Sequence, residues 1–209
     1  MTRYNHIAGQ STERLAALSD GVFAVAMTLL VLDLHIPAAD GVHTESDLIH
    51  LLASLAPRLL VYMLSFLSLG IFWVGQQTQI NYFARSDRDL TWVHLGFLFV
   101  VSLMPFSTAL MAEFFAYRTA LVAYWLNILF LGLLLLLSWY VASAHDLVKE
   151  PTPALTHIIK RRILVSQALY AGGAALCVFG TRYSLGCIIL VQLYYALAPA
   201  GRRRPAAQA

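Results

Sequence analysis

The chain has 209 residues, of which 59% are hydrophobic and 12% are charged, and its mean hydropathy is +0.69. This composition is typical of integral membrane proteins and excludes an ordinary water-soluble domain. The net charge of +3 is small. Because the basic residues cluster in connections and tails, as membrane orientation requires, nucleic-acid binding is not needed to explain them.

Six stretches of the chain are long and apolar enough to be membrane-spanning helices. A span needs about 20 apolar residues, because about 30 Å of hydrocarbon is crossed at about 1.5 Å per residue. Only the segment GTRYSLG at 180–186, which has the composition of a tight turn, separates the last two. We therefore predict an all-α integral membrane protein with a single six-helix domain over residues 1–200 and a short basic tail at 201–209. The predicted spans are residues 13–36, 49–77, 90–112, 118–144, 160–180 and 183–199.

The distribution of Lys and Arg predicts how these spans are oriented. With six spans both termini lie on one side of the membrane, and that side receives eleven of the 14 basic residues. Since basic residues collect on the cytoplasmic side, both termini are predicted to be cytoplasmic. The eleven are Arg3, Arg14, Arg85, Arg88, Lys149, Lys160, Arg161, Arg162, Arg202, Arg203 and Arg204, and the other three are Arg58, Arg118 and Arg182.

The first predicted span carries an ionisable residue, Asp20, within the sequence RLAALSDGVFAVAMTLLVLDLHIP. A charged side chain in the hydrocarbon costs at least a few kcal/mol, so it normally faces protein or water and has a partner. Together with Ser19, Asp20 forms a polar face that suits contact with neighbouring helices. Arg14 is six residues away and about 120° around the helix, so it is not expected to pair with Asp20. Each of the two is expected to meet a polar group of another helix or subunit, and the candidates are Trp73, Gln76, Gln77 and His94.

A second face of the same helix is an apolar stripe with one hydroxyl group. At about 100° per residue, Val25 lies roughly 140° from Asp20, whereas Thr28, Leu29 and Leu32 fall within about 60° of Val25. The pattern alone does not show what this stripe contacts, and its simplest explanation is packing against another helix.

Two segments of the chain resemble the transmembrane protein 175 family. In RLAALSDGVFAVAMTLLVLDL, Arg14, Ser19, Asp20 and Thr28 match the family's first-helix signature. The segment GIFWVGQQTQINYFARSDRDLTWVHLGFLFVVSLMPFSTAL at 70–110 is similar to the family's second helix, which ends near a Trp, and to its third helix, which contains Pro-Phe. The combination is specific, whereas any one of these short motifs alone is weak.

The sequence also differs from the family pattern at several positions. Leu18 stands where the family has Phe, which keeps an apolar side chain but loses the aromatic ring. After Trp73, relatives usually show histidines, and this chain has Gln76 and Gln77, which cannot titrate near neutral pH. His94 stands where relatives often have Asn. Family behaviour that depends on those histidines is therefore not carried over.

The resemblance implies a potassium-selective cation channel, built as a homotetramer in which the first helix of each subunit lines a central pore. By position, Val25 becomes a hydrophobic constriction where relatives usually have Ile or Leu, and Leu29 and Leu32 form further apolar rings. We expect Thr28 to supply a ring of hydroxyl oxygens that binds potassium transiently. The residues expected to hold the pore helix in place are Arg14, Leu18, Ser19, Asp20, Trp73 and His94.

Other site chemistry is not indicated. The sequence has no Thr-Val-Gly-Tyr-Gly stretch and no re-entrant loop candidate, so a filter lined by carbonyl groups is not expected. No catalytic triad, metal cluster or phosphate-binding loop stands out. We therefore expect neither an enzyme nor a cofactor other than the permeant ion, and no fixed metal site. Lys160, Arg161 and Arg162 most simply anchor the fifth helix, with anionic lipid as a secondary contact.

Two other functions remain open at this stage. Asp20, His94 and Glu113 would form the relay of a secondary transporter or of a proton or cation leak pathway. The other possibility is a noncatalytic membrane scaffold, in which the stripe on the first helix is only an oligomer interface. The expected partners are further copies of the chain, membrane lipids and potassium ions, without nucleic acid. The expected location is a prokaryotic cell membrane.

Overall fold

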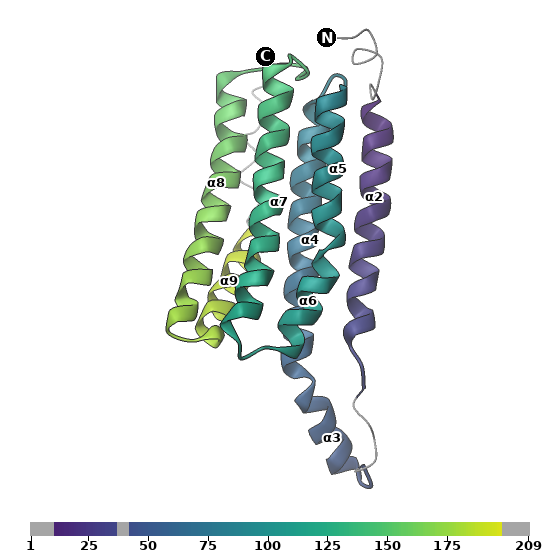
Figure 1. Cartoon of the computed structure of the whole chain (residues 1–209), viewed down its shortest axis with the longest axis vertical. Helices are drawn as coiled ribbons and strands as arrows, with labels where there is room; N and C mark the ends of the chain where they lie inside the picture. The colour runs from purple at the N-terminus through teal and green to yellow at the C-terminus, as the bar shows by residue number, and fades with distance from the viewer. Residues whose placement is uncertain (1–10, 37–41, 198–209) are drawn as a thin grey trace, which may run out of the picture.

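The computed structural model describes residues 11–36 and 42–197, and this part of the chain is a bundle of helices (Figure 1). The predicted tail at 201–209, together with Arg3, Arg202, Arg203 and Arg204, lies outside the described residues. The helices are α2 (Thr12–Leu29), α3 (Glu45–Ser54), α4 (Ala56–Tyr82), α5 (Arg88–Ser102), α6 (Met104–Glu113), α7 (Arg118–Ala144), α8 (Pro153–Ala175) and α9 (Thr181–Leu197), with short 3₁₀ segments η1 (Leu30–Asp33) and η2 (Leu176–Val178).

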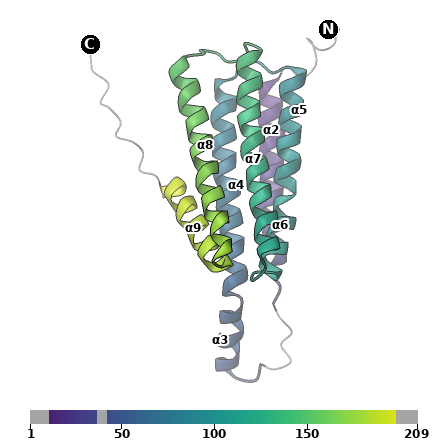
Figure 2. The same cartoon turned by 60° about the vertical axis from the view of Figure 1, so that its left-hand side comes forward.

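Each of the six predicted stretches contains a helix, which confirms the all-α membrane fold. Within the described residues, four helical segments are long and apolar enough to cross a membrane: Thr12–Leu32, Ala56–Tyr82, Arg88–Glu113 and Arg118–Ala144. The last two predicted spans correspond to α8, which carries three consecutive basic residues, and to α9, which has 17 residues. Figure 2 shows α9 as a shorter helix that leans away from the bundle.

Two of the predicted spans are interrupted in the structure. The stretch predicted at 49–77 consists of α3 and α4, which meet at Leu55, and the stretch at 90–112 consists of α5 and α6, which meet at Leu103. Pro57 and Pro105 follow these junctions, and a proline has no N–H to continue the hydrogen-bond ladder of the preceding helix. The first break lets α3 project beyond the end of the bundle (Figure 1).

The turn between the last two helices is shorter than the predicted segment 180–186, because α9 already begins at Thr181. Gly180 has a φ of 151°, a conformation that side-chain-bearing residues rarely adopt. The 3₁₀ segment η2 and this glycine together reverse the chain between α8 and α9.

The projecting helix α3 begins with a capping box. The Thr44 hydroxyl accepts the backbone N–H of Asp47, while the Asp47 carboxylate accepts the backbone N–H of Thr44. Hydrogen bonds from the Thr44 side chain and from the backbone of His43 and Thr44 hold the pKa of Asp47 below its usual range. These bonds satisfy N–H groups that the first turn of a helix leaves without partners.

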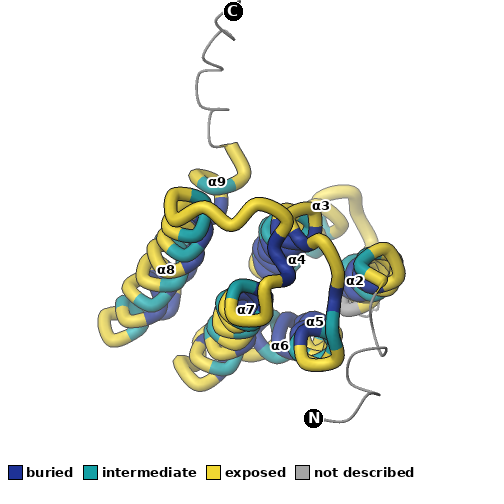
Figure 3. The backbone as a smooth tube through the Cα atoms, turned by 90° about the horizontal axis from the view of Figure 1, so that it is seen from above, coloured by how far each residue is buried: buried dark blue, intermediate teal, exposed yellow. Residues whose placement is uncertain are grey.

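The centre of the bundle is α7, which packs against α5, α6 and α8. Viewed from above, α2 lies at one edge, beside α4 and α5, and α8 lies at the opposite edge with α9 beside it (Figure 3). Buried residues face inward on α4, α5 and α7, whereas a large part of the surface of α2 and α8 is exposed. The two edges of the bundle therefore offer different surfaces to their surroundings.

A polar network joins four helices inside the apolar core. The Thr108 hydroxyl of α6 donates to Ser65 Oγ of α4 over 2.7 Å, and Gln192 Nε2 of α9 donates to Ser68 Oγ over 2.6 Å. Ser65 Oγ also donates to the hydroxyl of the fully buried Tyr124 on α7 over 3.3 Å. Buried polar groups are expensive without partners, so these bonds hold the helices in one arrangement.

At one end of the bundle, the α7–α8 connection is fixed to the turn between α4 and α5. Ala84 donates its backbone N–H to the carbonyl of Leu147 over 2.8 Å, and Lys149 donates its backbone N–H to the carbonyl of Tyr82 over 2.9 Å. Arg85, Arg88 and Lys149 belong to this end of the bundle, where α2 also begins (Figure 1).

Candidate functional site

The apolar stripe of α2 faces away from the rest of the protomer. Val25 is 58% exposed, Leu29 43% and Leu32 63%, and Thr28 is also exposed. The opposite side of α2 is buried against the bundle through residues that include Leu15, Ser19, Phe23 and Ala26. The four predicted pore residues thus lie together on a surface that a single protomer leaves uncovered.

A polar contact with α4 sets the rotation of α2 about its axis. Trp73 Nε1 and Gln77 Nε2 both donate to Asp20 Oδ1, over 2.8 and 2.7 Å. Gln76 Nε2 donates to Ser19 Oγ over 2.8 Å, and the Ser19 hydroxyl donates to the carbonyl of Leu15 over 2.8 Å. We call these five residues, Ser19, Asp20, Trp73, Gln76 and Gln77, the α2–α4 clamp.

The clamp explains why an acid is present in this helix. The Asp20 carboxylate accepts two hydrogen bonds from α4, and bonds to a charged acceptor are shorter and stronger than neutral ones. Because Asp20 lies roughly 140° around the helix from Val25, the side that is bound to α4 and the exposed stripe are different sides. Holding Asp20 and Ser19 on α4 therefore keeps the stripe pointing outward.

The Thr28 hydroxyl already donates its proton to the backbone of its own helix. Its Oγ1 lies 2.9 Å from the carbonyl oxygens of Ala24 and Val25, and its one proton is donated to this pair of acceptors. A threonine hydroxyl also has two acceptor lone pairs. With the proton turned toward the helix backbone, the free lone pairs make the exposed side of Thr28 an acceptor, which suits a cation.

A shallow groove runs along α2, includes part of the stripe and reaches α5. It is lined by Leu18, Gly21, Val22, Val25 and other small or apolar residues of α2, with Ser102 of α5 on its far side, and it has a volume of ≈ 460 Å³. Leu18 is 46% exposed here. Together, the groove and the stripe form a continuous apolar surface that needs a cover of protein or hydrocarbon.

Two residues predicted to support the pore helix lie apart from the clamp. His94 is buried on α5 with its ring edge-on to Phe83, and its Nδ1 lies 3.3 Å from the carbonyl oxygen of Leu90. Arg14 is exposed at the start of α2, and the ion pairs found among the described residues do not include it. Of the residues weighed as contacts of Asp20, the structure selects Trp73 and Gln77.

Removing the Asp20 carboxylate is expected to loosen α2. In Asp20→Ala, the Trp73 and Gln77 donors lose their acceptor, and a hydrogen bond to a charged group contributes about 1.5–3 kcal/mol. We expect the melting temperature of the purified protein to fall by several degrees in Asp20→Ala and by less in Asp20→Asn, which keeps one oxygen. Glu13→Ala, at an exposed position on the same helix, serves as control. Equal melting temperatures for Asp20→Ala and Glu13→Ala would show that the clamp does not hold α2.

Comparison with known proteins identifies relatives of this chain. A family model described as endosomal/lysosomal potassium channel TMEM175 matches residues 14–105. A potassium channel from Streptomyces collinus is 45% identical over 101 residues, and the alignment covers 48% of each protein, about half of that relative's length. A potassium channel from Chamaesiphon minutus is 31% identical over 191 residues, which are 89% of this chain and 94% of that protein.

A solved structure is similar over nearly the whole chain. It is the crystal structure of a lysosomal potassium-selective channel TMEM175 homolog from Chamaesiphon minutus, with a TM-score of 0.75 and 31% sequence identity, and the match covers 90% of this chain and 97% of that one. The residues of the stripe and the clamp all lie within residues 14–105, the range that the family model matches. The chain therefore belongs to the TMEM175 family, a family of multi-pass ion channels rather than enzymes.

Proposed function

We propose that this protein is a potassium-selective cation channel, formed by four copies of the chain with α2 of each lining a central pore. The observation that carries the proposal is the exposed stripe of Val25, Thr28, Leu29 and Leu32, which is apolar apart from one hydroxyl. The choice of potassium as the permeant ion rests on the relatives, which are named potassium channels.

The exposed stripe supports an assembly of several copies, and the number four is what the resemblance to the TMEM175 family implies. In a single protomer the stripe is exposed on α2, which lies at one edge of the bundle (Figure 3), so it does not surround a passage. Closed rotational symmetry makes every residue that faces the axis a ring with one member from each copy. Four copies with the stripe turned inward would cover the apolar groove of ≈ 460 Å³ and enclose a channel along the α2 helices.

The constriction in this arrangement consists of apolar rings. Val25, Leu29 and Leu32 offer no group that replaces the hydration shell of an ion, and a narrow apolar passage gates by losing its water. Opening must therefore widen and wet the passage. The clamp lies on the other side of α2, so it holds the helix in place without blocking the passage. The apolar rings then set the width of that passage.

The Thr28 ring supplies the selectivity. Four hydroxyl oxygens, each with its proton donated to the backbone of its own helix, replace part of the water around a passing cation. Potassium loses its water more easily than sodium, so a partial replacement favours potassium. Because this is one layer of hydroxyls rather than a row of carbonyl rings, the preference is modest, and potassium stays near Thr28 only transiently.

The orientation is set by the basic residues. The end of the bundle that carries Arg85, Arg88 and Lys149 faces the cytoplasm, and Arg58, Arg118 and Arg182 lie toward the opposite end, in agreement with the positive-inside rule. Both termini are then cytoplasmic, and the protein belongs in a prokaryotic cell membrane.

Flux in liposomes tests the function. We expect the reconstituted full-length chain to carry potassium down its gradient as an electrical current, without coupling to a proton gradient. Flux that is driven by a proton gradient would instead identify a secondary transporter, and no flux at all would identify a scaffold. The mass of the detergent-solubilised particle, measured by native mass spectrometry, is expected to correspond to four chains, and a monomer or dimer that still conducts would contradict the pore geometry.

A further inference from the structure

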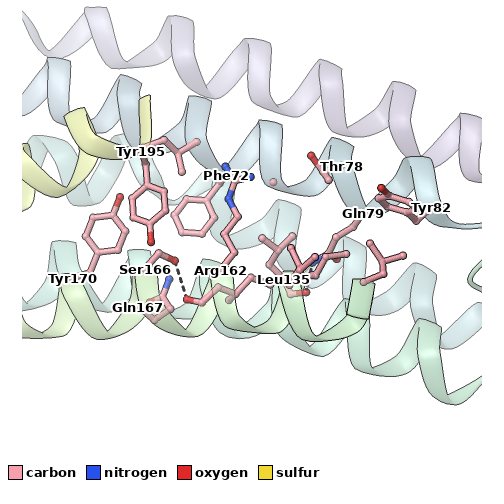
Figure 4. Close-up of a pocket in the computed structure, with 16 residues that line it drawn as sticks. Phe72, Thr78, Gln79, Tyr82, Leu135, Arg162, Ser166, Gln167, Tyr170 and Tyr195 are labelled. Carbon is pink, nitrogen blue, oxygen red and sulfur yellow. Dashed lines mark hydrogen bonds between the residues drawn. The ribbon is translucent and has the colours of Figure 1, made fainter. Parts of the chain in front are cut away.

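A second cavity lies on the side of the bundle away from α2. It has a volume of ≈ 160 Å³ and is bounded by α4, α7, α8 and α9. Most of its wall is apolar and includes Ile71, Phe72 and Leu135, while Tyr170 and Tyr195 lie close together at one end and Tyr82 at the other (Figure 4). This place, beside the outer edge formed by α8 and α9, is separate from the proposed pore.

Buried polar atoms without partners line this cavity. Gln79 Oε1 and the hydroxyl of Tyr170 have no hydrogen-bond partner among the described residues, although the two residues are only 2% and 1% exposed. Gln167 Oε1 also has no hydrogen-bond partner, while Gln167 Nε2 donates one long hydrogen bond of 3.4 Å to the carbonyl of Ile128. An unpaired buried polar group costs about 1–3 kcal/mol, and the three atoms belong to residues that border one cavity.

A basic side chain reaches into the same cavity. Arg162 extends from α8 across the cavity toward α4, with its guanidinium near Phe72 (Figure 4). Neither of the ion pairs found in the described part of the chain involves it. Arg162 lies nine residues after Pro153, the first residue of α8, which places it roughly 14 Å along the helix. The Arg162 side chain is exposed and lines the cavity, so its guanidinium is available to an anion there.

We propose that this cavity binds the headgroup of an anionic phospholipid. The phosphate accepts hydrogen bonds from the Arg162 guanidinium, which is suited to paired contacts with phosphate oxygens, and from the Tyr170 hydroxyl. Hydroxyl groups of a glycerol headgroup donate to the amide oxygens of Gln79 and Gln167. Each of the orphaned groups and the unpaired charge then has a partner.

The size and walls of the cavity favour a lipid over a soluble anion. A volume of ≈ 160 Å³ equals the share of about five water molecules in the liquid, which is enough for a headgroup but not for two acyl chains. The chains continue along the apolar side chains of α4 and α8, such as Ile71 and Ile158. The cavity belongs to the half of the bundle where the basic residues gather, and basic pockets on the cytoplasmic side bind anionic headgroups.

Lipid binding by the full-length protein tests this proposal. We expect phosphatidylglycerol, titrated into the protein in an uncharged detergent, to remain bound in native mass spectrometry and to raise the melting temperature until it saturates. Phosphatidylcholine, which is neutral overall, is expected to do neither. Soluble glycerol phosphate is the third probe: stabilisation by it equal to that by phosphatidylglycerol would overturn the assignment to a lipid.

Two variants and a matched control locate the site. Arg162→Gln is expected to weaken phosphatidylglycerol binding by at least about tenfold, since it removes a charge-assisted contact. Tyr170→Phe, which keeps the ring in place, is expected to weaken binding several-fold. Arg161→Gln removes the same charge from a neighbour that is exposed, as Arg162 is, but does not line the cavity, and its binding should equal that of the unaltered protein. Unchanged binding in Tyr170→Phe and in folded Arg162→Gln would refute the proposal, whether or not the protein conducts potassium.

Discussion

Replacing Thr28 with valine is expected to lower the potassium-to-sodium permeability ratio of the reconstituted channel by a factor of about ten. Valine keeps the shape of the side chain and removes the oxygen, so the ring at this level loses its acceptors for a partly dehydrated cation. A tenfold change corresponds to about 1.4 kcal/mol. The measurement is the reversal potential with potassium on one side of the bilayer and sodium on the other.

Two further variants test whether selectivity requires a hydroxyl group and whether that group must be at position 28. Thr28→Ser keeps an oxygen at this level, so it should preserve the permeability ratio. Thr78 on α4 is also exposed, and its hydroxyl makes the same kind of bond, to the carbonyl of Val74 over 2.7 Å. Thr78→Val is therefore the matched control, and its ratio should not change. If Thr28→Val selects potassium as well as the original chain does, the hydroxyl ring is not the selectivity element.

Much of the fold could be predicted because hydropathy and helical period are local properties. Apolar length located all six helical stretches. The angle between Asp20 and Val25 also separated two faces of the first helix, and in the structure one contacts α4 while the other is exposed. Hydropathy responds to composition alone, so it did not detect the junctions at Leu55 and Leu103. Pro57 and Pro105 were the available signals for those breaks.

Sequence could name candidate partners for Asp20 but could not choose among them, because the choice depends on packing between distant parts of the chain. Trp73 and Gln76 lie 53 and 57 residues from the α2 side chains that they contact. His94 was placed with the pore-helix motif, yet it lies against Phe83. For Arg162, sequence pointed to the membrane surface, and only the fold brings it beside the unpaired groups of Gln79 and Tyr170.

Two substitutions of Val25 are expected to have opposite effects on the passage of potassium. One narrows the ring, and the other makes it more polar. Val25→Leu adds a methylene group in each copy, which narrows the passage and makes it harder to wet, so single-channel conductance should fall several-fold. Val25→Asn has nearly the same size but offers an amide that binds water. The passage should then stay wet, and potassium leak through closed channels should rise by about ten times or more, because dewetting no longer holds the barrier.

Val74 supplies the matched control for this pair, since it is an exposed valine on α4 (46% exposed, against 58% for Val25) and lies outside the stripe. Val74→Leu and Val74→Asn should leave conductance and leak unchanged, although the amide lowers stability on an apolar surface. Conductance that is the same in Val25→Leu as in the original chain, and that collapses only for changes at Leu29 or Leu32, would move the constriction further along α2. Conductance that responds to Val74 and not to Val25 would instead place a different helix at the axis, because a side chain that faces lipid cannot control the hydration of the pore.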